Sequence, residues 1–335
     1  MMRNKKILVV IIMILTLSLT GCTKYVTDDG KNVREDTTGQ NLVSNILCKP
    51  EDENVLKTYE KYEKEGNYDI SELPSCSEFT PASGGYEGIW STLFIKPLSW
   101  LIIKLGTLFN NYGIAIIVVT LIIRFIIFPL SKKSAMQSEG MKAANKDLQK
   151  LQNKYKNRTS QQDQMMQAQE MMAIYKKYNI NPMAGCLFAF IQMPLFFAFL
   201  ESLYRIPAVF EGNFLLFNLG MTPFNALFGS SFSISNFIAS FSNGNIAYII
   251  LPIIVGLSTF FSFKMNSGMN VGNPEQEKQM KLMMNIMMIF ITFMSFIMST
   301  SIIIYWITGS LFTIVQTMLI RRSKDVRDSK VGSKK

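Results

Sequence analysis

The fold class is decided by one apolar stretch, which runs from Gly113 to Leu130 and reads GIAIIVVTLIIRFIIFPL. It contains a single charged residue, Arg124, and is close to the roughly 20 residues that a helix needs to cross ~30 Å of hydrocarbon. Further stretches with almost no charge lie at about residues 183–203, 246–263, 282–299 and 301–320. The sequence therefore predicts an all-α polytopic membrane protein with five transmembrane helices.

Composition agrees with membrane integration and excludes several kinds of chemistry. The chain has 335 residues, is 48% hydrophobic and carries a net charge of +10, but its basic residues flank the apolar stretches, where membrane topology explains them before nucleic-acid binding does. The absence of histidine excludes histidine-based catalysis, and the four cysteines lack the CxxC spacing of a zinc site. No phosphate-binding glycine loop is visible. We expect no enzyme activity, no metal and no cofactor.

Residues 1–22 have the layout of an export signal, with a basic start and an apolar run from Ile7 to Leu19. The tetrapeptide Leu19-Thr20-Gly21-Cys22 resembles a bacterial lipobox, whose cysteine is lipidated and becomes the new N-terminus. We therefore expect a lipoprotein signal peptide and a palmitate-bearing Cys22. The alternative is an ordinary signal anchor with a chance cysteine.

The next segment, residues 23–88, is polar and rich in Asp, Glu, Asn and Tyr. We expect an extracytoplasmic polar tether with little packed core and a short helix near Glu51–Glu65. A position outside the cell would permit a disulfide between Cys48 and Cys76, which the sequence alone leaves open.

Two further segments have helical patterns outside the predicted spans. In residues 89–111, apolar residues recur at helical spacing while Lys96 and Lys104 should share one polar side, which favours an amphipathic interfacial helix over a span. Residues 131–181 are polar and helix-favouring with a turn near residues 157–160, which predicts a hairpin of two helices.

Charge predicts the orientation. The hairpin has ten Lys or Arg against four Asp or Glu, and the loop 264–282 and the tail 323–335 are also basic, whereas residues 23–111 have nine against fourteen. The positive-inside rule places the hairpin and the basic tail in the cytoplasm and the N-terminal region outside. An odd number of spans after an exported N-terminus gives the same answer, and the segment 204–245 should then lie along the outer surface.

Arg124 is the strongest candidate for a functional residue, because an arginine at the centre of a span costs ~2.5–3.5 kcal/mol on insertion scales. It precedes Lys132 by eight residues, about 12 Å along a straight helix, so its side chain would have to reach far to leave the hydrocarbon. We favour an internal aqueous cavity around Arg124, with snorkelling as the alternative. Other polar residues of the spans are candidates for the same cavity: Gln192, Glu201, Thr259, Ser262, Thr308 and Gln316. Tyr305 and Trp306 fit either this cavity or an aromatic belt at the interface.

Motifs in several spans occur in a recognisable order. They are Ile123-Arg124-Phe125 with Phe128-Pro129-Leu130, Gln169-Glu170-Met171-Met172 with Tyr175-Lys176-Lys177-Tyr178, Ile180-Asn181-Pro182-Met183-Ala184-Gly185-Cys186 with Ile191-Gln192-Met193-Pro194, Pro274-Glu275-Gln276, and Tyr305-Trp306 with Gln316 and Arg321-Arg322. Over about Gly88–Arg322 the chain resembles the YidC/Oxa/Alb membrane protein insertase family, in the Gram-positive lipoprotein form with five spans. It departs from the family at Ser262-Phe263-Lys264, where many members carry glutamine, so we expect no such contact there.

The resemblance implies five helices around a hydrophilic groove that is open to the cytoplasm and the lipid and closed to the outside. Arg124 would lie in this groove, with Gln192 and Trp306 in its lining and Tyr305 and Gln316 as further candidates for contact with substrate. Its partners would be nascent membrane proteins, the lipid bilayer, the ribosome through the basic tail and hairpin, and the Sec translocon. The alternatives are a channel or small-solute transporter, or a structural anchor, but Arg124 and Glu201 alone make a poor ion route.

Overall fold

The structure is a computed structural model that describes residues 23–35, 38–66, 68–158, 160–181, 183–229, 232–266 and 274–332. The predicted signal peptide with Cys22 and the last three residues of the tail lie outside these ranges. The described chain forms two compact units. The first comprises residues up to Thr120 with Gln192–Ile253 and Met294–Trp306, and the second comprises Leu121–Ile191, Ile254–Phe293 and the residues after Trp306.

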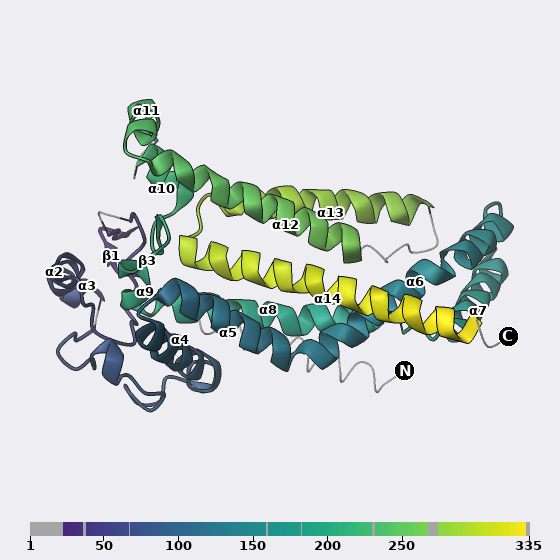
Figure 1. Cartoon of the computed structure of the whole chain (residues 1–335), viewed down its shortest axis with the longest axis horizontal. Coiled ribbons are helices and arrows are strands. Elements are labelled where there is room, and N and C mark those ends of the chain that lie inside the picture. The colour runs from purple at the N-terminus through teal and green to yellow at the C-terminus, as the bar shows by residue number, and fades with distance from the viewer. Residues whose placement is uncertain are drawn as a thin grey trace. The chain divides into compact units, whose positions relative to one another are not determined.

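The first unit contains short helices and two small hairpins (Figure 1). Its elements are β1 (Thr27–Asp28), β2 (Lys31–Asn32), α2 (Glu53–Lys61), α3 (Glu63–Gly66), η1 (Cys76–Glu78), η2 (Ser91–Ile95), α4 (Lys96–Phe109), α9 (Pro207–Glu211), β3 (Asn213–Phe214), β4 (Phe217–Asn218), α10 (Pro223–Phe228), α11 (Ile234–Ser242) and η3 (Asn245–Ile249). The second unit contains α6 (Phe128–Tyr155), α7 (Gln161–Lys177) and most of α13 (Pro274–Met294). Besides α13, whose last residue Met294 belongs to the first unit, four helices contribute residues to both units: α5 (Tyr112–Ile126), α8 (Met183–Tyr204), α12 (Ile250–Asn266) and α14 (Thr300–Gly332).

The N-terminal segment is a packed domain, so the prediction of a tether with little core is wrong. Its core consists of side chains at most 9% exposed, from Val26, Val33, Leu42, Val43, Ile46, Tyr59 and Ile70. A disulfide joins Cys48 to Cys76, which resolves the alternative that the sequence left open. Such a cross-link compensates for a small core, because it limits the freedom of the unfolded chain. The predicted short helix is present as α2 and α3.

Helix α4 follows one turn of π-helix, η2, and it does not have the polar side that the sequence predicts. Lys104 is exposed, but Lys96 is fully buried, and its ammonium group donates to the carbonyl oxygens of Ser83 and Gly85. The helix ends where the sequence predicts a break, since Asn110 adopts the left-handed conformation that commonly ends helices.

Helices α5 and α6 meet at a bend of 67° around Ile127. Pro129 lies in the first turn of α6, where its missing N–H is tolerated, whereas inside a continuous helix it would leave the carbonyl of Phe125 without its bond. The stretch Gly113–Leu130 is therefore not one continuous helix, because α5 ends at Ile126, and the single span over it stays a prediction. Arg124 lies in the last turn of α5 rather than deep inside a straight span.

Helices α6 and α7 form the predicted hairpin (Figure 1). They pack through Ala144, Leu148 and Tyr175, and the hydroxyl of Ser160 accepts a bond from the N–H of Asp163 at the start of α7. Methionines project away from this core: Met165, Met166 and Met172 are 61%, 44% and 51% exposed.

Among the described residues, three helices are long and apolar enough to cross a membrane: Ser91–Phe109, Asn245–Met265 and Thr300–Arg322. The bent pair α5 and α6 adds a fourth if it is counted as one span, and Lys281–Met294 is a shorter apolar helix. The predicted class, an all-α polytopic membrane protein, is confirmed. The number of five spans and the interfacial position of α4 stay predictions, and α14 continues as a helix into the predicted tail.

Candidate functional site

Arg124 lies against α14 within the second unit. A Cβ atom placed on Gly309 would be 2.4 Å from the Nη2 atom of Arg124, so the guanidinium group covers this glycine. Next to it, the rings of Phe125 and Phe312 meet edge to face with their centroids 5.3 Å apart. The absence of a side chain at Gly309 thus provides the space in which a half-buried arginine rests on the helix.

The position of Arg124 at the end of α5 lowers the cost of its charge. Helix C-termini carry a partial negative charge, and a cation in the last turn is favourable there by ~0.3–1 kcal/mol. Arg124 is also the only Asp, Glu, Lys or Arg in α5. Helix α5 therefore carries a single charged residue, which lies in its last turn.

Small polar residues of α12 are buried in the same unit. Ser258, Thr259 and Ser262 are at most 8% exposed, and the hydroxyl of Ser262 donates to the carbonyl oxygen of Ser310 over 3.2 Å. Ser262 therefore makes a polar contact with α14, although this chain lacks the glutamine that many family members carry in this region.

Gln316 lies farther along α14 and pairs with α6. Its side chain is 7% exposed, and its Nε2 and Oε1 atoms lie 3.0 and 3.2 Å from the hydroxyl of Ser131. Seven residues separate Gln316 from Gly309, which is about 10 Å along a helix. Gln316 and the Gly309 that Arg124 covers are thus about two turns apart on α14.

Of the remaining candidates, Gln192, Glu201, Tyr305 and Trp306 belong to the first unit, and Thr308 belongs to the second. Tyr305 is 5% exposed and its ring stacks on Phe199 with centroids 4.1 Å apart, while Trp306 meets Phe196 edge to face at 5.6 Å. Gln192 is half-buried on α8. Tyr305 therefore packs between helices, and Trp306 is the more accessible ring of the two.

A cluster of charges at the base of the hairpin was not predicted from the sequence. Glu139 accepts bonds from Lys142 and Arg321 at 2.8 and 3.0 Å, and both cations also donate to the carbonyl oxygen of Met265 at the end of α12. Burial raises the pKa of Glu139, but the two cations lower it more, and the pKa lies below its usual 4.5. This Glu139 cluster joins α6, α12 and α14. Only the charge of each residue is visible in the sequence, since the partners lie far apart along the chain.

A second cluster, also missed by sequence reasoning, is centred on Arg205 at the end of α8. Arg205 is 1% exposed and pairs with Glu87, donates to Ser91 over 2.9 Å and donates to the carbonyl oxygen of Asn45 over 2.6 Å. Lys96 joins through Glu87 at 3.2 Å, and Glu201, which the sequence placed in a cavity, accepts a bond from Trp90. Arg205 and Lys96 hold the pKa of Glu87 below its usual value although burial raises it. This Arg205 cluster fastens the N-terminal domain to α8.

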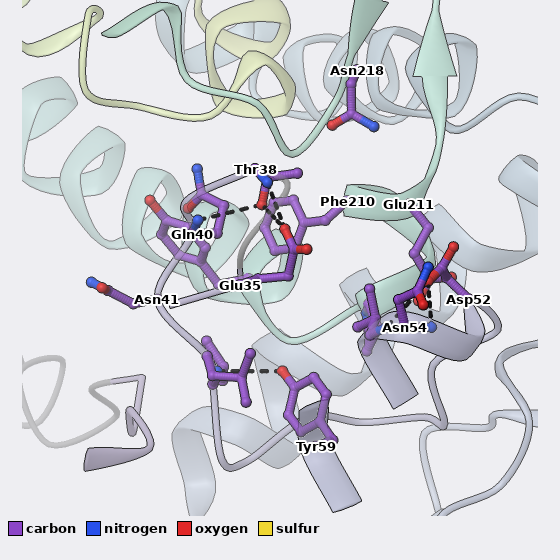
Figure 2. Close-up of a pocket in the computed structure, with 15 residues that line it drawn as sticks. Glu35, Thr38, Gln40, Asn41, Asp52, Asn54, Tyr59, Phe210, Glu211 and Asn218 are labelled. Atoms are coloured by element: carbon purple, nitrogen blue, oxygen red, sulfur yellow. Dashed lines mark hydrogen bonds between the residues drawn. The ribbon is translucent and has the colours of Figure 1, made fainter. Parts of the chain in front are cut away.

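The N-terminal domain contains a cavity of about 200 Å³, which Figure 2 shows. Its lining includes three carboxylates, and each has a role in the fold: Glu35 accepts from Thr38, Asp52 caps α2, and Glu211 accepts from the N–H of Glu51. Burial raises the pKa of Glu211. In the part of the chain that the structure describes, no group of three or more Cys, Asp or Glu residues has an arrangement that could hold a metal ion.

These observations define the class: a helical membrane protein with a half-buried arginine in the last turn of one apolar helix, packed on a second helix that is long enough to cross a membrane. The sequence profile of the 60Kd inner membrane protein family matches residues 104–328. The chain is 35% identical over 256 residues to the membrane protein insertase YidC of Oceanobacillus iheyensis, covering 75% of this chain and 91% of that protein. It is 34% identical over 268 residues to the membrane protein insertase MisCA of Bacillus subtilis, covering 78% and 92%. The chain belongs to this family, that of the YidC/Oxa/Alb insertases.

Proposed function

We propose that this chain is a membrane protein insertase, which inserts integral membrane proteins and helps them fold, and that Arg124 is the cation that contacts them during insertion. The observation that carries this role for Arg124 is its contact with Gly309. A charged group in a span costs free energy, yet the lack of a side chain at Gly309 of α14 leaves space for the guanidinium group of Arg124. Family membership and the similarity to two membrane protein insertases support the insertase function.

The mechanism follows from the cost of moving polar groups through lipid. A polar segment of a client loses water in ~30 Å of hydrocarbon, and each unpaired group costs roughly 2–7 kcal/mol. A hydrophilic groove that reaches partway across shortens this barrier. Arg124 attracts the acidic or polar segment of the client, and the buried hydroxyls of α12 and Gln316 of α14 provide further polar surface. The client then leaves, because its apolar helix is more stable in lipid than in a wet groove.

The hairpin and the tail supply contacts for clients and for the ribosome. The exposed methionines of α7 are flexible and suit varied apolar segments of nascent membrane proteins. The basic residues of the hairpin and tail suit the phosphate backbone of ribosomal RNA without reading its sequence. Cooperation with the Sec translocon is part of the same proposal. None of these steps requires a nucleotide or another cofactor.

The proposed location is the bacterial cell membrane, with a lipid anchor at Cys22, the N-terminal domain outside and the C-terminal tail in the cytoplasm. The Cys48–Cys76 disulfide supports an oxidising location for that domain.

Replacement of Arg124 tests the proposal in cells depleted of their own insertase. We expect Arg124→Ala to reduce insertion of a small client with an acidic exported tail, and Arg124→Lys to retain much of it. Lys133→Ala is the matched control, because it removes one exposed positive charge close by in the chain. Normal insertion with Arg124→Ala at equal expression would refute the role of Arg124. Crosslinks of the client to α7 distinguish an insertase from a transporter, and complete tolerance of every variant would favour a structural anchor.

A further inference from the structure

Helix α11 presents an apolar face that no residue described in the structure covers. Ile234, Ile238 and Phe241 lie on one side of this helix and are 67%, 66% and 62% exposed. The inner side is packed, since the ring of Phe237 stacks on Phe228 with centroids 5.3 Å apart. The three exposed side chains are therefore a distinct surface, which we call the α11 face.

The hairpin of β3 and β4 ends in a second apolar surface. Its two turn residues, Leu215 and Leu216, are 79% and 84% exposed. Leu215 has a φ of 54°, a left-handed conformation in which Gly, Asn or Asp is usual. The hairpin tip thus places leucines where water-exposed turns carry polar residues.

Contacts place both surfaces at the ends of transmembrane helices. A Cβ atom on Gly113 would lie 2.4 Å from the ring of Phe214, so the hairpin packs on the first turn of α5. Helix α11 contacts η3, which leads directly into α12. The exposed residues of that junction, Ile249, Ile250 and Ile253, continue the apolar surface into a helix of membrane-spanning length.

The charge pattern favours lipid over a protein partner. From Gly212 to Phe263 the chain has no Asp, Glu, Lys or Arg. A protein interface normally has a polar rim and about 20–30 residues on each side, whereas each surface here consists of two or three large apolar side chains. Lipid acyl chains require neither charge nor a shaped partner.

We propose that the α11 face and the β3–β4 tip insert into the boundary between headgroups and acyl chains of the bilayer, at the level where α5 and α12 begin. The two surfaces set the depth of the protein on the side of its N-terminal domain. The attachment is purely hydrophobic and does not depend on anionic lipid. The proposal requires membrane integration but not insertase activity, so each can fail without the other.

Spin labels test the proposal in the full chain reconstituted in vesicles. Cys22 and Cys186 are replaced by Ala, the disulfide is left in place, and single cysteines are introduced as Ile238→Cys or Leu216→Cys. Ala239→Cys is the control, because this exposed residue follows Ile238 but points to another side of α11. Power saturation then gives the accessibility of each label to oxygen, which partitions into lipid, and to a water-soluble nickel chelate.

We expect the ratio of oxygen to nickel accessibility at positions 238 and 216 to be several-fold higher than at position 239. The ratio should be the same in vesicles of phosphatidylethanolamine alone and with added phosphatidylglycerol. Equal nickel accessibility at all three positions would overturn the proposal, because the surfaces would then face water. Protection from both reagents with spin–spin broadening would also overturn it, in favour of contact between two copies of the chain.

Discussion

The contact between Arg124 and Gly309 can be disturbed without changing the charge of the protein. In Gly309→Ala the new methyl group would lie 2.4 Å from Nη2 of Arg124, whereas ordinary contacts are 3.4–4 Å, so the guanidinium group must move by about 1 Å or change rotamer. A strained rotamer costs ~0.5–1.5 kcal/mol. Alanine stabilises a helix interior relative to glycine by ~0.5–1 kcal/mol. The two effects nearly cancel, and we expect the thermal stability to change by less than ~1 kcal/mol.

Function should change more than stability, because the displaced guanidinium group no longer has its place on α14. We expect insertion of the client with an acidic tail to fall in Gly309→Ala, in the same direction as in Arg124→Ala. Gly256→Ala is the matched control, since its methyl group would lie 3.1 Å from the hydroxyl of Thr292 on α13 and does not touch Arg124. Insertion assays in depleted cells and heating followed by size-exclusion chromatography measure the two quantities. Wild-type insertion by Gly309→Ala together with loss in Arg124→Ala would show that the position of the arginine on α14 is unimportant.

Four further predictions concern the clusters and the disulfide. Arg205→Met leaves carboxylates buried without their cation and should destabilise the protein by ~3–5 kcal/mol, measured by thermal unfolding; a change below ~1 kcal/mol would contradict the structure. The pKa of Glu87 is lower in the folded protein, so its stabilising contribution is present above pH about 4.5 and is lost as the pH falls through the folded-state pKa. The wild type should therefore lose stability on acidification, and Glu87→Gln should lose less stability over the same pH range. Cys48→Ser removes the disulfide and should destabilise the N-terminal domain by ~2–5 kcal/mol, seen as faster proteolysis at residues 23–88 than in the wild type, with an unchanged rate as the contrary result. Glu139→Gln removes the negative charge that pairs with Lys142 and Arg321 and should increase cleavage in the hairpin by added protease, whereas unchanged cleavage would show that the charge of Glu139 does not hold α6.

The class of fold could be predicted from the sequence because it depends on local properties. Apolar length predicts helices in a membrane, and the polar segment with its central turn predicts the hairpin of α6 and α7. The bend near Ile127 was also accessible in principle, because Pro129 is a visible helix breaker. The interpretation of Gly113–Leu130 as one span placed the end of the helix near Leu130 rather than at Ile126, and so placed Arg124 farther from a helix end than the structure does.

The parts that could not be predicted depend on contacts between distant residues. The helical pattern of the sequence places Lys96 on a polar side of the helix. In the structure its ammonium group is buried and donates to the carbonyl oxygens of Ser83 and Gly85, which the pattern cannot reveal. The N-terminal core is built from few apolar residues separated by polar ones, and the disulfide joins residues 28 apart. Composition alone therefore suggests a tether, whereas the contacts between these apolar residues and the disulfide produce a packed domain.

The site was predicted in part. Arg124 stood out because a lone charge in an apolar stretch needs an explanation, yet its neighbour Gly309 gives no signal of its own in one sequence. Tyr305 was chosen for its aromatic ring, and burial against Phe199 makes it a packing residue between α8 and α14. Pattern identifies unusual residues, whereas the role of each depends on what it touches.

The link between Arg205 and the N-terminal domain also constrains the order of biogenesis. The guanidinium group of Arg205 binds the carbonyl of Asn45, 160 residues earlier, and the carbonyl of Arg205 accepts the N–H of Leu47. During synthesis the domain emerges first, but these bonds form only after α8 has been made and integrated. A chain released from the ribosome before residue 205 would carry a domain with nothing to dock on. The N-terminal domain is made early but is secured only after α8, the second predicted span, has been inserted, so part of the chain must enter the membrane before this domain reaches its final place.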